Sequence, residues 1–181
     1  MSHINLTRTV RGSLALLAFS LAGCGLTQRA IDSTQSAYDA VFHKKIKVLH
    51  LDFSAREALN TDASESNSLS EPLVVRIYQL KDEKIFSKSV YQQLLKHGDT
   101  LLEADRLSTR DVVIKPGGDV SLDMPMEIDT KFVAVVGLFR HPDVMNNSWK
   151  LLLNREELDP DEPRIIEARS NHLVLQPVKD D

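Results

Sequence analysis

Alternating apolar and polar residues indicate strands along most of the chain. In "VSLDMPMEID", residues 120–129, the apolar side chains from Val120 to Ile128 occupy every second position. This period predicts a strand with one core face and one solvent face. Pro125 lacks an N–H and lies on the polar face, which places the strand at a sheet edge. The turn residues "KPGGD", 115–119, predict a hairpin with the extended run before them.

Seven further extended runs bring the expected number of strands to about eight. The alternation in "IKVLHLDF", residues 46–53, slips once and indicates a bulge. "KFVAVVGLF", 131–139, is apolar on both faces, as in a central strand that is covered on both sides. Trp149, at the start of another run, is either an interface anchor or, more commonly, a core residue. The remaining predicted strands are residues 73–80, 111–114, 149–153, 164–168 and 172–178.

One segment has a helical period. In "FSKSVYQQLLKHG", residues 86–98, Phe86, Val90 and Leu94 repeat every four residues, and Gly98 is placed to end the helix. Such a helix must bury its apolar stripe, so we expect it to pack on an end or a face of the sheets. The elements together predict an all-β domain, a two-sheet β-sandwich of about eight strands with one added amphipathic helix.

The N-terminal pattern is different, a short apolar run that ends at the only cysteine. Arg8 and Arg11 precede or begin the run, and the small residues Ala22 and Gly23 follow it, as in a secretory signal. The run is shorter than the about 20 residues that cross a bilayer as a helix. An ordinary secretory signal with an incidental cysteine remains an alternative to a lipoprotein signal.

The quartet Leu21-Ala22-Gly23-Cys24 resembles the lipobox of bacterial lipoproteins. The resemblance implies cleavage before Cys24 and acylation of the new N-terminus. Gly25 stands where an Asp usually retains such proteins in the inner membrane, so the implied destination is the outer membrane, facing the periplasm. The predicted organisation is a signal peptide at 1–23, a lipidated N-terminus and tether at 24–45, and a β-sandwich domain at 46–181.

Charge and motif content argue against several functions. The 181-residue chain has a formal net charge of −4 at pH 7, and removal of the signal with its two arginines makes it more acidic. This charge argues against nucleic acid as a partner, because phosphates require clustered cations. No cysteine remains for a disulfide, so the domain depends on packing. We expect no cofactor.

No catalytic or metal-binding constellation is apparent. The histidines occur singly, and neither a metalloprotease motif nor a nucleophile elbow is present. His50 and Asp52 share one strand face, either as an acid–base pair or, the favoured interpretation, as part of a polar outer face. The acidic segment 156–162 lacks the glycine of a calcium loop and contains Pro160. A solvated loop is therefore favoured over a calcium site.

The loop between the first two predicted strands is unusually long and polar. It begins with a possible capping box, Ser54 to Glu57, for one helical turn. Unstructured loops above about 12 residues are uncommon unless they are functional or disordered. Two interpretations follow: a recognition loop on a rigid sandwich, or surface disorder. Since the loop has no period that would turn its residues inward, we expect residues such as Asp62, Glu65, Asn67 and Leu69 not to be core. The candidate partner-binding residues are Asn60, Thr61, Asp62, Ser64, Glu65, Ser66, Asn67, Ser68 and Leu69.

Beyond the lipobox, the sequence resembles the TssJ-type (SciN-type) outer-membrane lipoproteins of bacterial type VI secretion systems. The resemblance is carried by "EPLVVRIYQLKDEKIF", residues 71–86, by Pro116-Gly117 and by Trp149. It covers roughly residues 46–178. It implies a transthyretin-like β-sandwich, tethered to the outer membrane, that binds the C-terminal periplasmic domain of the inner-membrane protein TssM.

Three function classes follow from the residues alone. They are a non-catalytic tether and binding module, a periplasmic lipoprotein that binds a small ligand or glycan, and a periplasmic enzyme. The anchor, the long polar loop and the missing catalytic constellation favour the first class. The resemblance adds the partner, and implies a multi-protein complex that joins the two membranes and docks the secretion apparatus.

Overall fold

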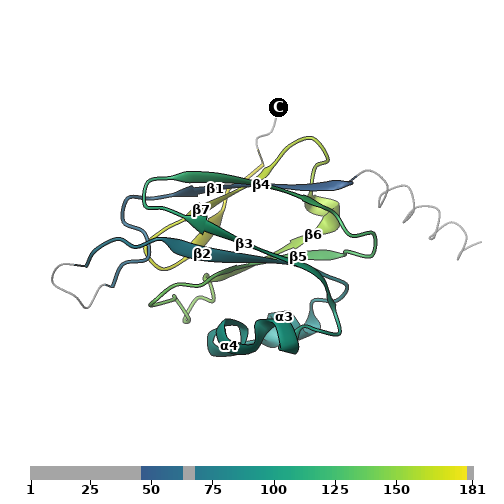
Figure 1. The fold of residues 1–181 in the computed structure, drawn as a ribbon, viewed down its shortest axis with the longest axis horizontal. Coiled ribbons are helices and arrows are strands. Elements are labelled where there is room, and N and C mark those ends of the chain that lie inside the picture. The colour runs from purple at the N-terminus through teal and green to yellow at the C-terminus, as the bar shows by residue number, and fades with distance from the viewer. Residues whose placement is uncertain (1–45, 63–67, 179–181) are drawn as a thin grey trace, which may run out of the picture. The chain divides into compact units, whose positions relative to one another are not determined.

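Two four-stranded sheets lie face to face in the computed structural model, which describes residues 46–62 and 68–178 (Figure 1). The strand order is β4-β1-β7-β8 in the first sheet and β3-β2-β5-β6 in the second. The predicted eight-stranded sandwich is confirmed. The first sheet contains β1 (Val48–Ala55), β4 (Asp119–Pro125), β7 (Arg164–Ala168) and β8 (Leu173–Leu175); the second contains β2 (Leu73–Leu80), β3 (Arg106–Ile114), β5 (Phe132–Gly137) and β6 (Lys150–Asn154).

Period-two patterning places one face of each sheet in the core. Leu49, Leu51 and Phe53 of β1 are buried and alternate with more exposed residues. β1 pairs antiparallel with β4 and parallel with β7, so it is a central strand of its sheet. β4 is an edge strand, as the position of Pro125 predicts. β5 is central and buried on both faces, which confirms the prediction from its continuous apolar run.

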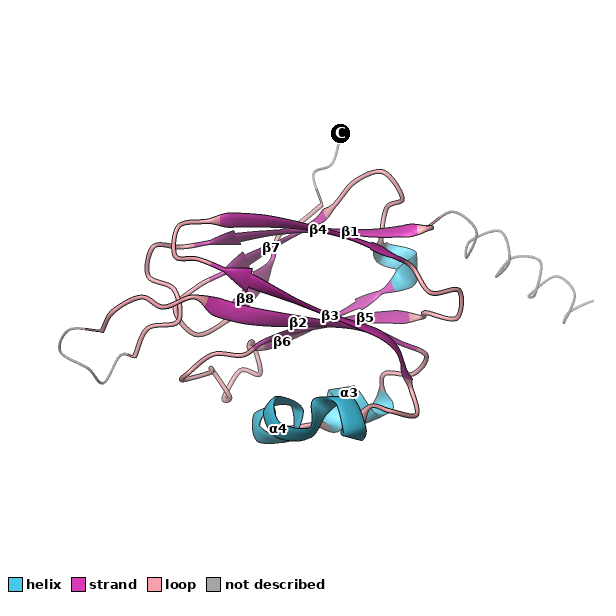
Figure 2. Ribbon diagram, in the orientation of Figure 1, coloured by secondary structure: helices cyan, strands magenta, loops and turns pink. Residues whose placement is uncertain are grey.

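Helices α3 (Lys84–Lys88) and α4 (Tyr91–Leu101) cover the outer face of the second sheet (Figure 2). Tyr91 meets Trp149 edge-to-face, with ring centroids 5.1 Å apart and planes at 85°, and its hydroxyl donates to the carbonyl of Phe139. Trp149 is fully buried, so the core interpretation of this residue is confirmed. Within the described residues, the first sheet has no helix on its outer face (Figure 2).

The prediction of one continuous helix is wrong. The helix divides at Ser89 and Val90, which are extended, so Val90 is exposed while Leu94 is buried. Gly98 lies within the range of α4, but His97 before it has non-helical angles, φ −137° and ψ 18°, so the helix kinks next to the residue that is predicted to end it. A Cβ at Gly98 would collide with the Tyr78 hydroxyl, so the glycine permits close approach of α4 to β2.

Lys150 contacts the C-terminal end of α3. Its Nζ donates to the carbonyl oxygens of Phe86, Ser87 and Ser89 at 3.1, 3.0 and 2.9 Å. Carbonyls in the last turn of a helix lack the donors of a following turn; of these three, the Phe86 carbonyl also accepts from the backbone N–H of Ser89, at 3.1 Å. The ammonium also lies 5.2 Å from the Phe86 ring centroid, a cation–π distance. Partial burial lowers the pKa of Lys150.

Three expectations about the strands are also corrected. The run before "KPGGD" and the run after it do not form a hairpin, because β3 pairs with β2 and β4 pairs with β1 in the other sheet. The β1 register with β4 is unbroken from Val48 to Ser54, so β1 has no bulge there; Ile46 simply precedes the strand. β4 ends at Pro125, which leaves Ile128 exposed.

The two ends of the sandwich differ in construction. We call the end where β1 and β7 begin the entry end; it holds Ile46, residues 126–131 and η1 (Arg155–Glu157). The buried Arg155 donates through Nη1 to Thr130 O and through Nη2 to Ile46 O, at 3.0 and 3.1 Å. These hydrogen bonds join the first described residue of the domain to the β4–β5 connection.

We expect Lys150→Met to lower the free energy of unfolding by about 1–3 kcal/mol, because it removes charge-assisted hydrogen bonds from partly buried carbonyls. Chemical denaturation monitored by circular dichroism measures the change. Lys96→Met is the matched control, since Lys96 is exposed on α4. Equal effects of the two substitutions would show that the three carbonyl contacts contribute nothing specific.

Candidate functional site

Loops from both sheets meet at the end of the sandwich opposite the entry end (Figure 1). Thr61 N donates to Ser170 O at 3.1 Å, and Asp143 N donates to Asn171 O at 3.0 Å. The backbone therefore links the β1–β2 loop and the β5–β6 loop to the same β7–β8 turn. We call this surface the loop end; its described residues are 56–62, 68–72, 138–149 and 169–172.

Asn60 fixes the stem of the β1–β2 loop. Its Oδ1 accepts from Arg140 N at 2.8 Å, and its Nδ2 donates to Pro72 O at 3.2 Å. Its φ of 51° lies in the left-handed region, which asparagine tolerates better than most residues. Arg140 also pairs with Glu71 at 3.0 Å. Both described ends of the β1–β2 loop are thus held by the β5–β6 loop.

Asp62 makes a second connection. Its carboxylate lies 3.5 Å from His141 Nε2, and its backbone N–H donates to Ser68 Oγ. Asn60 and Asp62 are both buried, so the expectation that Asp62 is not core is wrong. The burial of Asn60 is compensated by its hydrogen bonds to Arg140 and Pro72, and the Asp62 carboxylate has the contact with His141. The β1 strand continues to Ala55 and no helical turn follows, so the predicted capping box is also wrong.

The other predicted site residues are distributed as follows. Thr61 and Ser68 are partly buried in the stem, and Leu69 is exposed. Outside the described residues lie Cys24, Gly25, Ser64, Glu65, Ser66 and Asn67.

Sequence reasoning missed an exposed apolar pair on the β5–β6 loop. Val144 is 56% and Met145 92% exposed, and Leu69, on the neighbouring β1–β2 loop, is 76% exposed. Asp143 holds this loop in a tight turn by accepting hydrogen bonds from Asn146 and Ser148, and those from Asn146 contribute most to lowering the pKa of Asp143. The missed signal is an apolar pair inside the turn-forming sequence "HPDVMNNS".

The other candidate chemistry is not assembled into a reactive site. His50 Nδ1 pairs with Asp123 at 2.6 Å, across to β4, on the outer face of the first sheet. Within the acidic run, Glu157 accepts from the side chain of Asn154, and Asp159 accepts from the backbone N–H of Asp161. Among the described residues, no group of three or more His, Cys, Asp or Glu is arranged to hold a metal ion.

A groove of about 750 Å³ lies at the entry end, beside η1 and the start of β7. Acidic residues such as Glu156 and Glu162 form part of it, together with apolar residues such as Ile165 and Val178. None of its lining residues is aromatic. In the described part of the chain, no helix has the length and apolarity needed to cross a membrane.

Comparison with known proteins identifies relatives of the whole described domain. The family model described as "Type VI secretion lipoprotein, VasD, EvfM, TssJ, VC_A0113" matches residues 47–176. A comparison with curated proteins found no match.

Solved structures give the same result. The chain is 45% identical to a chain of a structure named "Type VI membrane complex", with a TM-score of 0.68 and coverage of 73% of this chain and 99% of that chain. It is 44% identical to a chain of "T6SS protein TssM C-terminal domain (869-1107) from EAEC", with a TM-score of 0.64 and coverage of 74% and 100%.

A more distant structure supports the fold. The crystal structure of the type VI lipoprotein TssJ1 from Pseudomonas aeruginosa is 19% identical, with a TM-score of 0.58 and coverage of 74% of this chain and 99% of that chain. At this identity the likeness concerns the β-sandwich alone. The family match over most of the chain and the relatives of 45% and 44% identity together show that this chain belongs to the family of type VI secretion lipoproteins, components of a membrane complex.

Proposed function

We propose that this chain is a non-catalytic outer-membrane lipoprotein whose loop end binds the C-terminal periplasmic domain of TssM. The observation that carries the proposal is the loop end itself: two loops are held by hydrogen bonds at their stems and expose Leu69, Val144 and Met145. Large exposed apolar side chains on adjoining loops at one end of a domain favour an interaction site there. The choice of partner is supported by the solved structure that is named for a TssM C-terminal domain and has a 44% identical chain.

The proposed attachment uses the N-terminal region. Residues 1–23 act as the signal peptide, residues 24–45 form the lipidated tether, and residues 46–181 form the binding domain. Each buried CH₂ of an acyl chain contributes about 0.8 kcal/mol, and two or more chains anchor a protein stably. Gly25, in place of Asp, directs the protein to the outer membrane.

The arrangement of the domain suits a connector between two membranes. The described chain begins at the entry end, and β1, with eight residues, runs from there to the loop end. At about 3.3 Å per residue, this strand separates the two ends by roughly 26 Å. The partner-binding surface therefore lies at the end of the sandwich away from the point where the tether joins.

The alternative function, a lipoprotein that binds a small ligand or glycan, is less well supported. The groove at the entry end is large enough for a small ligand. Its lining has no aromatic side chain on which a sugar ring would stack. The loop end is the better candidate because it exposes the large apolar residues Leu69, Val144 and Met145 and its stems are fixed.

We expect Cys24→Ser to give a folded protein that leaves the outer membrane, because acyl chains on Cys24 are the proposed anchor. Membrane fractions washed with salt and examined by immunoblotting measure the change. Thr27→Ser, a neutral change in the same segment, is the control. Full retention of the serine variant in washed outer membranes would contradict lipid anchoring at this residue.

We expect Gly25→Asp to move the protein to the inner membrane and to abolish secretion, since a connector with both ends on one membrane joins nothing. Density-gradient separation of the membranes and a secretion assay are the measurements. Gly25→Ser should leave both results unchanged. Normal secretion by a relocated Gly25→Asp protein would show that bridging is not its role.

The loop end is tested by titration with the purified C-terminal periplasmic domain of TssM. We expect Met145→Ser to weaken binding roughly tenfold to a hundredfold, because burying a methionine side chain contributes about 1.5–3 kcal/mol. Replacement of residues 63–67 by a Gly-Ser linker should also weaken binding, and it spares the buried Asp62. Thermal melting should be unchanged in both variants.

Ile128→Ser is the matched control for Met145→Ser. Ile128 is exposed and apolar like Met145, but it lies at the entry end. Its substitution should leave the dissociation constant at the wild-type value. If Met145→Ser and the linker variant both bind as tightly as the wild type, the site lies elsewhere on the domain.

A further inference from the structure

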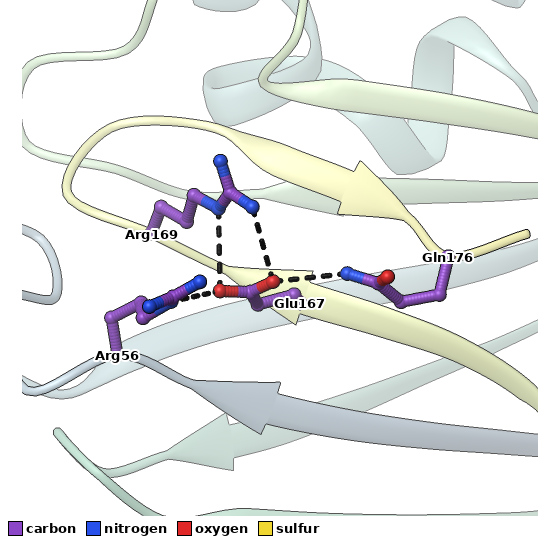
Figure 3. A network of polar contacts seen from close by, with 4 residues as sticks. All are labelled: Arg56, Glu167, Arg169 and Gln176. Carbon is purple, nitrogen blue, oxygen red and sulfur yellow. Dashed lines mark hydrogen bonds and ion pairs between the residues drawn. The ribbon is translucent and has the colours of Figure 1, made fainter.

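Two arginines share one carboxylate beside the loop end. Arg56 follows β1 directly, and Arg169 begins the β7–β8 turn (Figure 3). Arg56 Nε donates to Glu167 Oε1, while Arg169 donates through Nε to Oε1 at 3.3 Å and through Nη2 to Oε2 at 3.2 Å. Gln176 Nε2 adds a hydrogen bond to Oε2 at 2.9 Å. Four contacts therefore occupy the two oxygens of Glu167.

The Glu167 carboxylate is largely buried, whereas the two arginine side chains are more exposed. The side chain of Glu167 is only 12% exposed, whereas those of Arg56 and Arg169 are 64% and 38% exposed. The contacts from Arg169, and then those from Arg56, hold the pKa of Glu167 below its usual value. Glu167 therefore remains ionised and fixes the position of both guanidinium groups.

Both guanidinium groups retain unused donors. A guanidinium has five N–H groups in a planar fork. Arg56 uses only Nε, and its two Nη groups have no acceptor among the described residues. Arg169 Nη1 likewise has no acceptor in the described part of the chain. The unused donors belong to exposed side chains whose positions are already restricted.

Another arginine in the same domain shows the contrasting case. Arg76 pairs with Asp111 through two hydrogen bonds, both of 2.8 Å, so one cation faces one anion. In the Arg56–Glu167–Arg169 network two cations face one anion. Asp119 of β4 lies on the same sheet face, opposite Ser54 in the register, but forms no ion pair with either arginine within the described residues.

We propose that Arg56 and Arg169 form a binding site for a carboxylate side chain on the surface of the protein that the loop end binds. This inference rests on the proposed function. Arg56 is the first residue of the β1–β2 loop, and Ser170, next to Arg169, accepts a hydrogen bond from Thr61 of that loop. The arginine pair and the exposed apolar residues thus belong to one end of the domain.

Arginine suits this role better than lysine, because its planar fork matches a carboxylate with two parallel hydrogen bonds. Glu167 is a positioning residue: it holds the two forks before the partner arrives. Because the two arginine side chains are already ordered, binding does not have to offset the loss of their conformational entropy.

The test is a titration of the full mature domain with the C-terminal periplasmic domain of TssM. We expect Arg56→Gln and Arg169→Gln each to weaken binding roughly fivefold to thirtyfold, in the range for charge-assisted contacts at interfaces. Both variants should also show a flatter dependence of the dissociation constant on salt than the wild type. Arg110→Gln is the matched control, because Arg110 is exposed on β3 in the other sheet.

A purely structural role predicts different results. If the network only braces the fold, the glutamine variants melt at lower temperature and keep the wild-type salt dependence. If a glutamine variant melts at a lower temperature than the wild type, the titration is made with Arg56→Lys instead. Lysine keeps the positive charge but lacks the planar guanidinium that forms two parallel hydrogen bonds. Weaker binding by Arg56→Lys at wild-type stability supports the carboxylate site, and wild-type affinity overturns it.

The outcomes separate this inference from the proposed function. Wild-type binding by the arginine variants, with weakened binding by Met145→Ser, overturns the carboxylate site and leaves the loop end as the binding surface. Wild-type binding by both sets of variants overturns both proposals. Weakened binding by the arginine variants, with a normal Arg110→Gln control and a flattened salt dependence, supports the site.

Discussion

The pairing of β1 with both β4 and β7 is the constraint on which the rest of the structure depends. It joins a strand near the start of the domain to two strands far along the chain, antiparallel on one side and parallel on the other. Its register turns Leu49, Leu51 and Phe53 into the core. Because β1 and β7 run in the same direction, they also end together, and this brings Arg56 and Arg169 side by side at the loop end.

Buried polar side chains fix the conformation of the loops, which strand pairing does not determine. Gln79 accepts from Glu127 N and donates to Pro125 O at the entry end, and Asn60 connects Arg140 to Pro72 at the loop end. A buried amide that lost its partners would cost about 1–3 kcal/mol, so these contacts strongly disfavour other loop arrangements. The proposed binding surface is rigid at its stems for this reason.

The sequence predicts which face of a strand is buried more reliably than it predicts which strands pair. Period two identifies most of the strands, a continuous apolar run identifies the central β5, and Pro125 identifies the edge strand β4, because all three are local properties of the sequence. It does not say which sheet a strand joins, so the turn between β3 and β4 predicts a hairpin although it crosses between sheets. The helix break and the burial of Asn60 also escape prediction, because Lys150 and Arg140 lie 61 and 80 residues away from their partners Ser89 and Asn60.

The same limit applies to the candidate site, where loop length pointed to residues 60–69 but not to Val144 and Met145. Val144 and Met145 stand inside a turn-forming sequence, and only the fold shows that the β5–β6 loop contacts the β1–β2 loop. The two kinds of contact at this end have different physical consequences for the proposed interface. Desolvated apolar anchors mainly slow dissociation, whereas exposed charges speed association and set orientation. An apolar pair at the same end of the domain as two positioned arginines would therefore combine a long-lived contact with a defined docking direction, as the proposed connector between two membranes requires.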